Sequence, residues 1–212
     1  MIYRNADASR RWSMPPMRLM IVILAGGESR RMGGGKPLRM LGSETLVARA
    51  LRRACGWSGN VRLALRSPGQ VPEPGAPVLL DDPEIGGPLA GLAAAARAAE
   101  ADGCSHLLSL PCDMPFLPGD LLERLAGSIG DAGVAVAASG GQPHPVCALW
   151  SVEALREIGA YRQEGRRSLK GLAKRVGIIA VAWPQGAFAN VNTPEELAEA
   201  ERRIESEVEN LE

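Results

Sequence analysis

The residues best suited to chemistry in this 212-residue chain lie in one glycine-rich, basic segment, residues 24–36, which reads L-A-G-G-E-S-R-R-M-G-G-G-K. The segment follows an apolar run, residues 20–24, that has the length and β-branched content of a buried strand. Glycines let backbone N–H groups surround phosphate oxygens, and Arg30, Arg31 and Lys36 add positive charge. The segment therefore predicts a phosphate-binding loop in preference to a flexible surface loop.

The spacing of the glycines excludes two common nucleotide motifs. A P-loop requires Ser or Thr after its Gly-Lys pair, whereas Pro37 follows Lys36 here. The dinucleotide-binding fingerprint requires G-x-G-x-x-G, and the glycines of this segment are spaced differently. We therefore expect a phosphorylated ligand, but neither an ATPase nor a dehydrogenase.

A second candidate for chemistry is Asp113. It follows an apolar run, residues 106–110, and stands within P-C-D-M-P-F, between hydrophobic neighbours. Open α/β sheets bind ligands at the carboxyl ends of their strands, and Mg²⁺ is held by one or two carboxylates together with substrate phosphates. Asp113 is therefore a candidate Mg²⁺ ligand, with a capping or turn role as the alternative.

Three further segments are candidates for binding. Residues 86–92, G-G-P-L-A-G-L, begin an alanine-rich helix whose N-terminus can hold an anion, although the alanines also suit close packing on a sheet. Six cations in residues 162–175 form either a solvated face or a surface that steers an anionic substrate. Asn190 and Asn192 precede the last helix, either as turn residues or as ligands of polar substrate groups.

Composition limits the class of function. The formal net charge is zero, which argues against nonspecific binding to nucleic acid or to an anionic membrane. No apolar run reaches the roughly 18 residues that a membrane-spanning helix requires. The four cysteines lack C-x-x-C spacing and only two histidines are present, which predicts a reducing, cytoplasmic setting without a zinc site or a disulfide framework.

The elements that must position these residues are strands and helices in alternation, which predicts an α/β fold with a mostly parallel central sheet and helices on both faces. Ser43 and Ser151 are expected to cap helices, and residues 140–144 to form a turn. Strands are predicted at residues 20–24, 61–65, 78–80, 106–110, 134–137, 145–150 and 178–183, and helices at residues 44–55, 88–101, 121–129, 152–158, 162–175 and 194–208.

The chain is expected to form one domain with a loose beginning. Residues 1–17 are polar, contain two consecutive prolines and predict a flexible N-terminal extension, whereas residues 18–208 predict a single domain. The alternation of strands and helices loosens after about residue 138, so we expect the second half to build a substrate-specific region.

Five motifs, in this order, resemble those of the molybdenum cofactor guanylyltransferases, the MobA-type nucleotidyltransferases. The resemblance covers about residues 18–200 and implies a Rossmann-like nucleotidyltransferase fold, with a nucleotide-binding N-terminal part and a pterin-binding C-terminal part. It also implies transfer of GMP from GTP to the phosphate of molybdenum-bound molybdopterin, release of pyrophosphate, and Mg²⁺ as cofactor. The motifs are L-A-G-G-E-S-R-R-M-G-G-G-K, D-D-P-E-I-G-G-P-L-A-G, P-C-D-M-P-F-L, H-P-V-C-A-L-W and F-A-N-V-N-T-P-E-E-L.

The resemblance also assigns roles to individual residues. Lys36 contacts the nucleotide phosphates, Asp113 carries Mg²⁺, and Arg31 acts with them in catalysis. Asp81 belongs to the nucleotide site, with Asp82 as the alternative. The nucleotide side further includes Leu24, Ala25, Gly26, Gly27 and Gly34, and the pterin side includes Asn190, Asn192 and His144.

Two positions depart from the family pattern. The family loop often reads M-G-x-D-K, and Gly35 stands where that Asp would be. Relatives often carry a nucleotide-binding Asn in the second βα loop, which here reads Leu65-Arg66-Ser67, so that role cannot be carried over. Guanine specificity is therefore less firmly implied than nucleotidyl transfer.

Rival functions remain open at this point. Close rivals are a cytidylyltransferase for the same cofactor and a sugar-phosphate nucleotidyltransferase, and a more distant one is a non-catalytic GTP-binding partner that delivers the cofactor. L-A-G-G and P-C-D favour the guanylyl type. Molybdoenzymes and other cofactor-biosynthesis proteins are candidate partners beside GTP and molybdopterin, for a monomer or a weak oligomer that binds neither nucleic acid nor membrane.

Overall fold

The computed structural model describes residues 3–4, 17–27 and 34–209 of the chain. The predicted catalytic residue Arg31 and the predicted phosphate-loop residues Arg30 and Gly33 lie outside these ranges. Most of the predicted N-terminal extension also lies outside them, so its boundary at residue 17 stays a prediction. No helix in the described ranges is long and apolar enough to cross a membrane.

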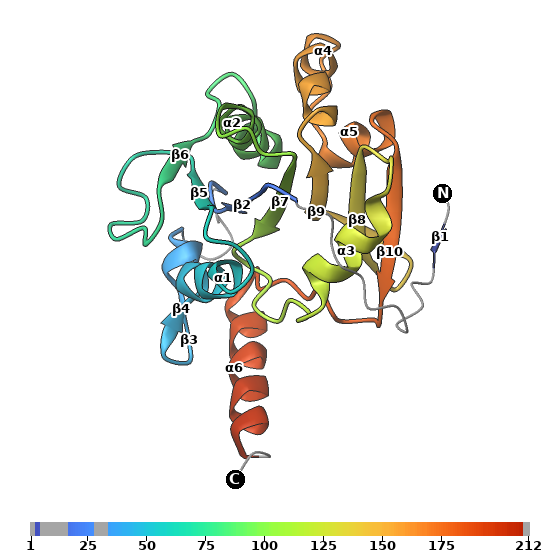
Figure 1. Ribbon diagram of the computed structural model, residues 1–212. Coiled ribbons are helices and arrows are strands. Elements are labelled where there is room, and N and C mark those ends of the chain that lie inside the picture. Colours follow the sequence, from blue (N-terminus) through green and yellow to red (C-terminus); the bar gives the residue numbers. More distant parts are fainter. Residues whose placement is uncertain (1–2, 5–16, 28–33, 210–212) are drawn as a thin grey trace.

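A central eight-stranded sheet organises the described chain, in the order β1-β10-β8-β9-β7-β2-β5-β6 (Figure 1). Strand β9 runs antiparallel to its neighbours β7 and β8, and every other pairing in this sheet is parallel. The predicted mostly parallel sheet is confirmed. The strands are β1 (Tyr3–Arg4), β2 (Leu19–Leu24), β5 (Val61–Leu65), β6 (Val78–Leu80), β7 (His106–Pro111), β8 (Val134–Ser139), β9 (Gln142–Ser151) and β10 (Ile178–Trp183).

Helices cover both faces of the sheet (Figure 1). Side chains alternate along a strand, so Ile21 and Ile23 of β2 enter one apolar cluster and Met20 and Val22 enter the other. All four are fully buried, and each contributes about 1.5–3 kcal/mol by leaving water. Helices α1 (Leu46–Cys55) and α3 (Leu121–Ile129) cover the first face, and α2 (Pro88–Ala101), α4 (Ile158–Gln163) and α5 (Leu169–Arg175) cover the second.

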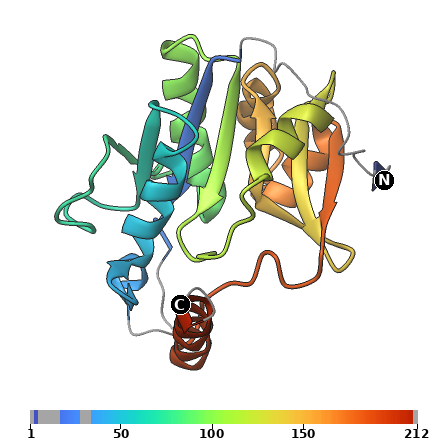
Figure 2. The same cartoon turned by 60° about the horizontal axis from the view of Figure 1, so that its bottom comes forward.

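Helix α6 (Pro194–Glu209) extends away from these layers, as two views show (Figures 1 and 2). Its base packs on the small β3–β4 hairpin (Met40–Leu41, Glu44–Thr45) through a third apolar cluster that includes Leu41 and Ala200. The predicted capping box at its start is confirmed, because Glu196 N donates to Thr193 Oγ1 while Thr193 N donates to Glu196 Oε2. This box fixes the segment just before the helix, and it is this segment that enters the site.

Two predicted helix caps are wrong. Thr45 caps α1, since its Oγ1 accepts a hydrogen bond from Ala48 N at 3.2 Å, whereas Ser43 lies in the turn of the β3–β4 hairpin. Ser151 is the last residue of β9, and the chain then forms a short 3₁₀ helix, Ala154–Glu157, before α4. At Ser151 the pairing with His106, which is distant in sequence, overrides the local preference of serine for a helix start, and at Ser43 the tight turn of the β3–β4 hairpin does so.

The turn predicted at residues 140–144 is shorter in the structure. Gly140 and Gly141 make it, with φ of 55° and 75°, and β9 begins directly afterwards at Gln142. Two prolines in Q-P-H-P-V obscured the strand, because proline donates no ladder hydrogen bond. Pro145 falls within the stretch where the β8–β9 register shifts, and Pro143 pairs with Ala138 at its edge, which is where a sheet tolerates proline.

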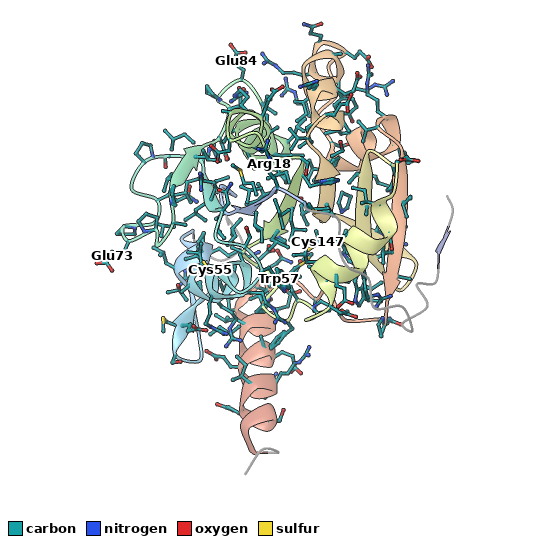
Figure 3. All side chains as sticks on the ribbon, in the orientation of Figure 1. Arg18, Cys55, Trp57, Glu73, Glu84 and Cys147 are labelled. Atoms are coloured by element: carbon teal, nitrogen blue, oxygen red, sulfur yellow. The ribbon has the colours of Figure 1, made fainter. Side chains whose placement is uncertain are left out.

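The cationic run at residues 162–175 is divided between two helices instead of forming one. Helix α4 ends at Gln163, Gly165 turns the chain with φ of 75°, and Ser168 caps α5 by accepting from Gly171 N at 3.0 Å. The four cysteines are free thiols, with Cys147 buried between sheet and helix and Cys55 exposed (Figure 3).

Candidate active site

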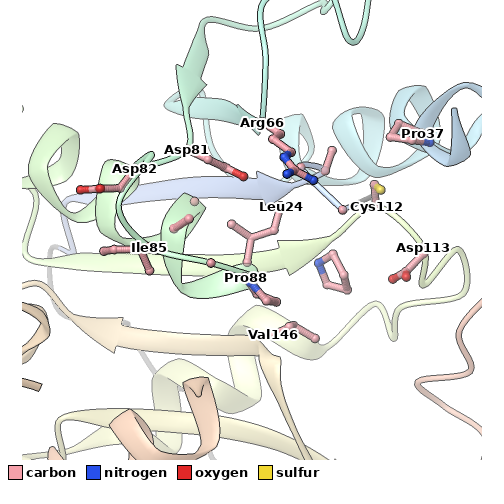
Figure 4. Close-up of a pocket in the computed structure, with 18 of the residues that line it drawn as sticks. Leu24, Pro37, Arg66, Asp81, Asp82, Ile85, Pro88, Cys112, Asp113 and Val146 are labelled. Carbon is pink, nitrogen blue, oxygen red and sulfur yellow. The ribbon is translucent and has the colours of Figure 1, made fainter. Parts of the chain in front are cut away.

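A cavity of about 990 Å³ lies at the carboxyl ends of β2, β5 and β7 (Figure 4). Its other walls are the loop after β6, the start of α2 and the segment before α6. Gly34 and His144 do not line it. The predicted site residues that do line it are Leu24, Ala25, Gly26, Gly27, Lys36, Asp81, Asp113, Asn190 and Asn192, and the alternative Asp82 lines it as well.

Lys36 is the buried cation of this cavity. Gly35, at φ 62° and ψ 21°, takes the left-handed conformation that glycine adopts readily, and the chain then turns through a short 3₁₀ helix, Lys36–Leu38. This turn leaves Lys36 only 8% exposed. Its Nζ lies 2.5 Å from Asp113 Oδ2 and 2.8 Å from Asn192 Oδ1, so one ammonium group joins an anionic and a polar oxygen.

Backbone pairing brings the C-terminal segment to the end of β7. Val191 N donates to the carbonyl oxygen of Asp113 at 2.8 Å, and Asn192 N donates to Glu196 Oε2 at 2.6 Å. Val191 itself is buried in the cluster beneath α6. The predicted nucleotide loop and the predicted pterin segment therefore meet at Lys36 and Asp113.

Asp81 and Asp82 have different environments. The Asp81 carboxylate fills space left by two glycines: a Cβ at Gly26 would lie 2.1 Å from its Oδ2, and one at Gly91 would lie 3.0 Å from its Oδ1. Burial raises the pKa of Asp81, against the opposing charge of Arg66. The structure thus orients this carboxylate toward the cavity by packing.

The Asp82 carboxylate is occupied by the chain itself. It accepts hydrogen bonds from Glu84 N at 3.1 Å and from the Arg97 guanidinium at 3.0 Å. Burial works against ionisation of Asp82, but these bonds and the charges of Arg97 and Arg162 outweigh it and lower its pKa. Asp81 is therefore the better placed of the two for a ligand.

The start of α2 forms another wall of the cavity. Pro88 occupies the first helical position, as predicted, and Gly87 before it has φ of 68°. Both residues line the cavity, together with Gly86. Backbone N–H groups at a helix start favour anions, so this wall suits a phosphorylated ligand.

His144 lies outside the cavity, on β9. Its Nε2 is 2.9 Å from Ser139 Oγ, and its ring centroid is 5.0 Å from that of Phe188. Burial lowers the pKa of His144, which favours the neutral imidazole at neutral pH. His144 therefore supports the segment that carries Asn190 without facing the cavity.

Two arginines also line the cavity, although the sequence analysis predicted neither of them as a site residue. Arg66 follows β5 directly, and Arg167 lies in the turn between α4 and α5. Arg167 was visible as part of the cationic run, in which Arg162 pairs with Glu84 and Arg175 pairs with Glu157. Arg66 had no motif of its own, and only its position after a strand could have indicated it.

Sequence comparison identifies the family. The model of the MobA-like NTP transferase domain matches residues 21–176. The chain belongs to this family. Among its relatives, a molybdenum cofactor guanylyltransferase of Cereibacter sphaeroides is 40% identical over 189 residues, which covers 87% of this chain and 96% of the relative. One of the same name from Acidiphilium cryptum is 41% identical over 189 residues, covering 86% and 94%.

Solved structures agree with the MobA-like family at the level of the fold. Molybdopterin-guanine dinucleotide biosynthesis protein A from Archaeoglobus fulgidus matches with a TM-score of 0.72 at 23% identity, over 88% of this chain and 99% of that chain. A 2-C-methyl-D-erythritol 4-phosphate cytidylyltransferase from Thermus thermophilus matches with a TM-score of 0.64 at 21% identity, over 89% and 100%. The predicted nucleotidyltransferase fold is confirmed.

Proposed function

We infer that this chain transfers GMP from GTP to molybdopterin, forming molybdopterin guanine dinucleotide and releasing pyrophosphate. The observation that carries the proposal is the single buried ammonium of Lys36, which joins Asp113 at the nucleotide cavity to Asn192 of the C-terminal segment. The guanylyltransferase relatives at about 40% identity, matched over nearly their whole length, support the same conclusion.

The chemistry needs charge neutralisation more than proton transfer. An oxygen of the molybdopterin phosphate attacks the α-phosphorus of GTP, the bond to the β-phosphate oxygen breaks, and pyrophosphate leaves with the electron pair. The attacking phosphate is already ionised at neutral pH, so no strong general base is required. Lys36 supplies positive charge beside the reacting phosphates, where a buried cation acts more strongly than one in water.

Mg²⁺ fits the donor set around Lys36. Two oxygens, Asp113 Oδ2 and Asn192 Oδ1, already point toward one cationic atom. The described ranges contain no group of three or more His, Cys, Asp or Glu side chains that could hold a metal without help from the substrate. Asp113 would therefore hold Mg²⁺ together with triphosphate oxygens, as is usual for this ion. When bound there, the ion would supply positive charge that offsets the charge of the triphosphate and of the departing pyrophosphate.

The two ends of the cavity are proposed to bind different substrates. GTP lies against Leu24, Ala25, Gly26, Gly27 and Asp81, and molybdopterin lies on the side of Asn190 and Asn192, which His144 supports from behind. Arg31 and Gly34 are proposed to complete the phosphate loop. The proposal includes a cytoplasmic enzyme that passes its product to molybdoenzymes.

The direct test is pyrophosphate release from the full chain with molybdopterin, Mg²⁺ and either GTP or CTP. We expect turnover with GTP, and we expect Asp113→Ala to abolish it while the thermal unfolding transition remains cooperative. Arg52→Ala is the matched control, because Arg52 forms a surface ion pair with Glu44 away from the cavity. Turnover with CTP alone would show a cytidylyltransferase, and GTP binding without any turnover would show a delivery partner. Either result overturns the proposal.

A further inference from the structure

We propose that Arg66 is the base-specificity residue of the nucleotide cavity, and that its guanidinium donates to O6 and N7 of guanine while the adjacent Asp81 carboxylate accepts from N1–H and the 2-amino group. The inference rests on the proposed guanylyl transfer.

The position of Arg66 is the first support. Strand β5 ends at Leu65, so Arg66 occupies the carboxyl edge of the sheet next to β2. It lines the same cavity as Leu24 and Asp81, and Figure 4 shows the Arg66 and Asp81 side chains reaching toward the same end of that cavity, beside Leu24. The charge of Arg66 also favours ionised Asp81, which opposes the effect of burial on its pKa. A cation and an anion thus lie side by side at one end of the cavity.

The structure holds this end of the cavity in place before any ligand arrives. Gln70 Oε1 accepts from Arg66 N at 2.9 Å, and Gln70 Nε2 donates to the carbonyl oxygen of Ala25 at 2.8 Å. One side-chain amide therefore ties the loop after β5 to the loop after β2. On the other side, the Asp81 carboxylate occupies space next to Gly26 and Gly91, and a Cβ at either glycine would crowd it. The backbone of Arg66 and the Asp81 carboxylate are thereby preorganised.

The neighbouring cation and anion match the acceptors and donors along the edge of guanine. Around its rim guanine presents two neighbouring acceptors, N7 and O6, followed by two neighbouring donors, N1–H and the 2-amino group. An arginine fork satisfies the acceptors and a carboxylate satisfies the donors, so one cation beside one anion reads all four groups. Adenine alternates acceptor, donor and acceptor along the same rim. Cytosine offers the carboxylate one amino group in place of two neighbouring donors.

Equilibrium binding with Mg²⁺ tests the inference without requiring turnover. GTP is compared with 7-deaza-GTP, which lacks the N7 acceptor, by titration calorimetry on the full chain. We expect wild type to bind 7-deaza-GTP several-fold more weakly than GTP. The Arg66→Ala variant should bind GTP about 10- to 100-fold more weakly than wild type, because a bidentate arginine contact contributes that much to discrimination. The variant should also bind GTP and 7-deaza-GTP equally well. Arg66→Lys, which keeps the charge and loses the fork, should recover less than half of the loss in log affinity.

Two controls separate this inference from a structural effect and from the proposed function. Arg52→Ala, on the surface of α1, should keep the wild-type preference for GTP over 7-deaza-GTP. If Arg66→Ala also keeps that preference, the inference is overturned while guanylyl transfer stands. If wild type shows no turnover yet Arg66→Ala abolishes the preference, the inference stands and the proposed transfer falls. Preference of the wild type for CTP overturns both.

Discussion

The Nζ atom of Lys36 lies 2.5 Å from Oδ2 of Asp113, although the two residues are separated by 77 positions in the sequence. The same nitrogen lies 2.8 Å from Oδ1 of Asn192, which is 156 positions away. Three segments that enclose the cavity are therefore held by one cation. A polyphosphate that enters the cavity meets an ammonium group that has already lost most of its water, so little reorganisation is needed when charge develops during the reaction.

Replacement of Lys36 by Met is expected to remove this charge at nearly constant length. The rate kcat for pyrophosphate release should fall about 100- to 1000-fold, the usual effect of losing one group that stabilises transition-state charge. The free energy of unfolding should fall by about 1–2 kcal/mol, because Asp113 loses its partner. Both are measurable, by a coupled pyrophosphate assay and by urea unfolding.

Arg52→Met is the control for that change, since its partner Glu44 lies at the surface and exposed ion pairs contribute about 0–1 kcal/mol. A Lys36→Met enzyme whose kcat stays within threefold of wild type would contradict the role of Lys36.

Replacement of Asp81 by Asn is expected to increase stability and weaken binding. Burial raises the pKa of Asp81 above its usual 3.8, so the folded chain disfavours the ionised form. Below pH 3.8 the carboxyl is protonated in both states and costs nothing, and the cost is complete above the folded pKa. The Asp81→Asn variant should therefore unfold at a higher urea concentration than wild type at pH 7. The difference between the two urea midpoints should shrink as the pH falls toward 4. GTP affinity at pH 7 should fall about 10- to 100-fold. Equal urea midpoints at pH 7 would contradict the burial of this charge.

The sequence predicted the parts of the fold that local pattern determines. Apolar runs placed β5 and β10 correctly, and the capping box located the start of α6, because each signal lies within a few residues. Strand β9 was only partly found, since its prolines fall at a register shift that depends on β8. Ser151 was assigned to a helix because its pairing with His106 is distant in sequence.

The same distinction between local and distant signals applies to the prediction of the site. Lys36 and Asp113 belong to recognisable motifs, and the structure brings them together. The Gln70 amide, which bridges Ala25 and Arg66, could not be predicted, because its two bonds depend on how two separate loops pack. Hydrogen bonds between separate loops become visible only when the chain is folded.

The conformation of Gly35 predicts which side chains this position of the loop tolerates. Its φ of 62° lies in the left-handed region, and a Cβ there would meet no atom within 4 Å. Asp tolerates this conformation better than most residues, whereas β-branched residues do not. Gly35→Asp should therefore cost about 1 kcal/mol or less in unfolding free energy and keep kcat within a few-fold of wild type. Gly35→Val should cost about 1–2 kcal/mol. Equal urea midpoints for the two variants would show that the loop does not hold this conformation.

Gly26 is expected to act on GTP through Asp81. A Cβ at Gly26 would lie 2.1 Å from Asp81 Oδ2 and 3.2 Å from the backbone N of Arg66, so Gly26→Ala must turn the carboxylate away. We expect the variant to fold, because a side-chain end can move, and to lose GTP affinity about as strongly as Asp81→Asn. Gly127→Ala in α3 is the matched control, since a Cβ there meets nothing within 4 Å and should add about 0.5–1 kcal/mol of stability at unchanged affinity. The double variant of Gly26→Ala and Asp81→Asn should bind GTP no more weakly than Gly26→Ala alone, because both changes remove the same contact. Additive losses in calorimetric titrations would show instead that Gly26 contacts the nucleotide independently of Asp81.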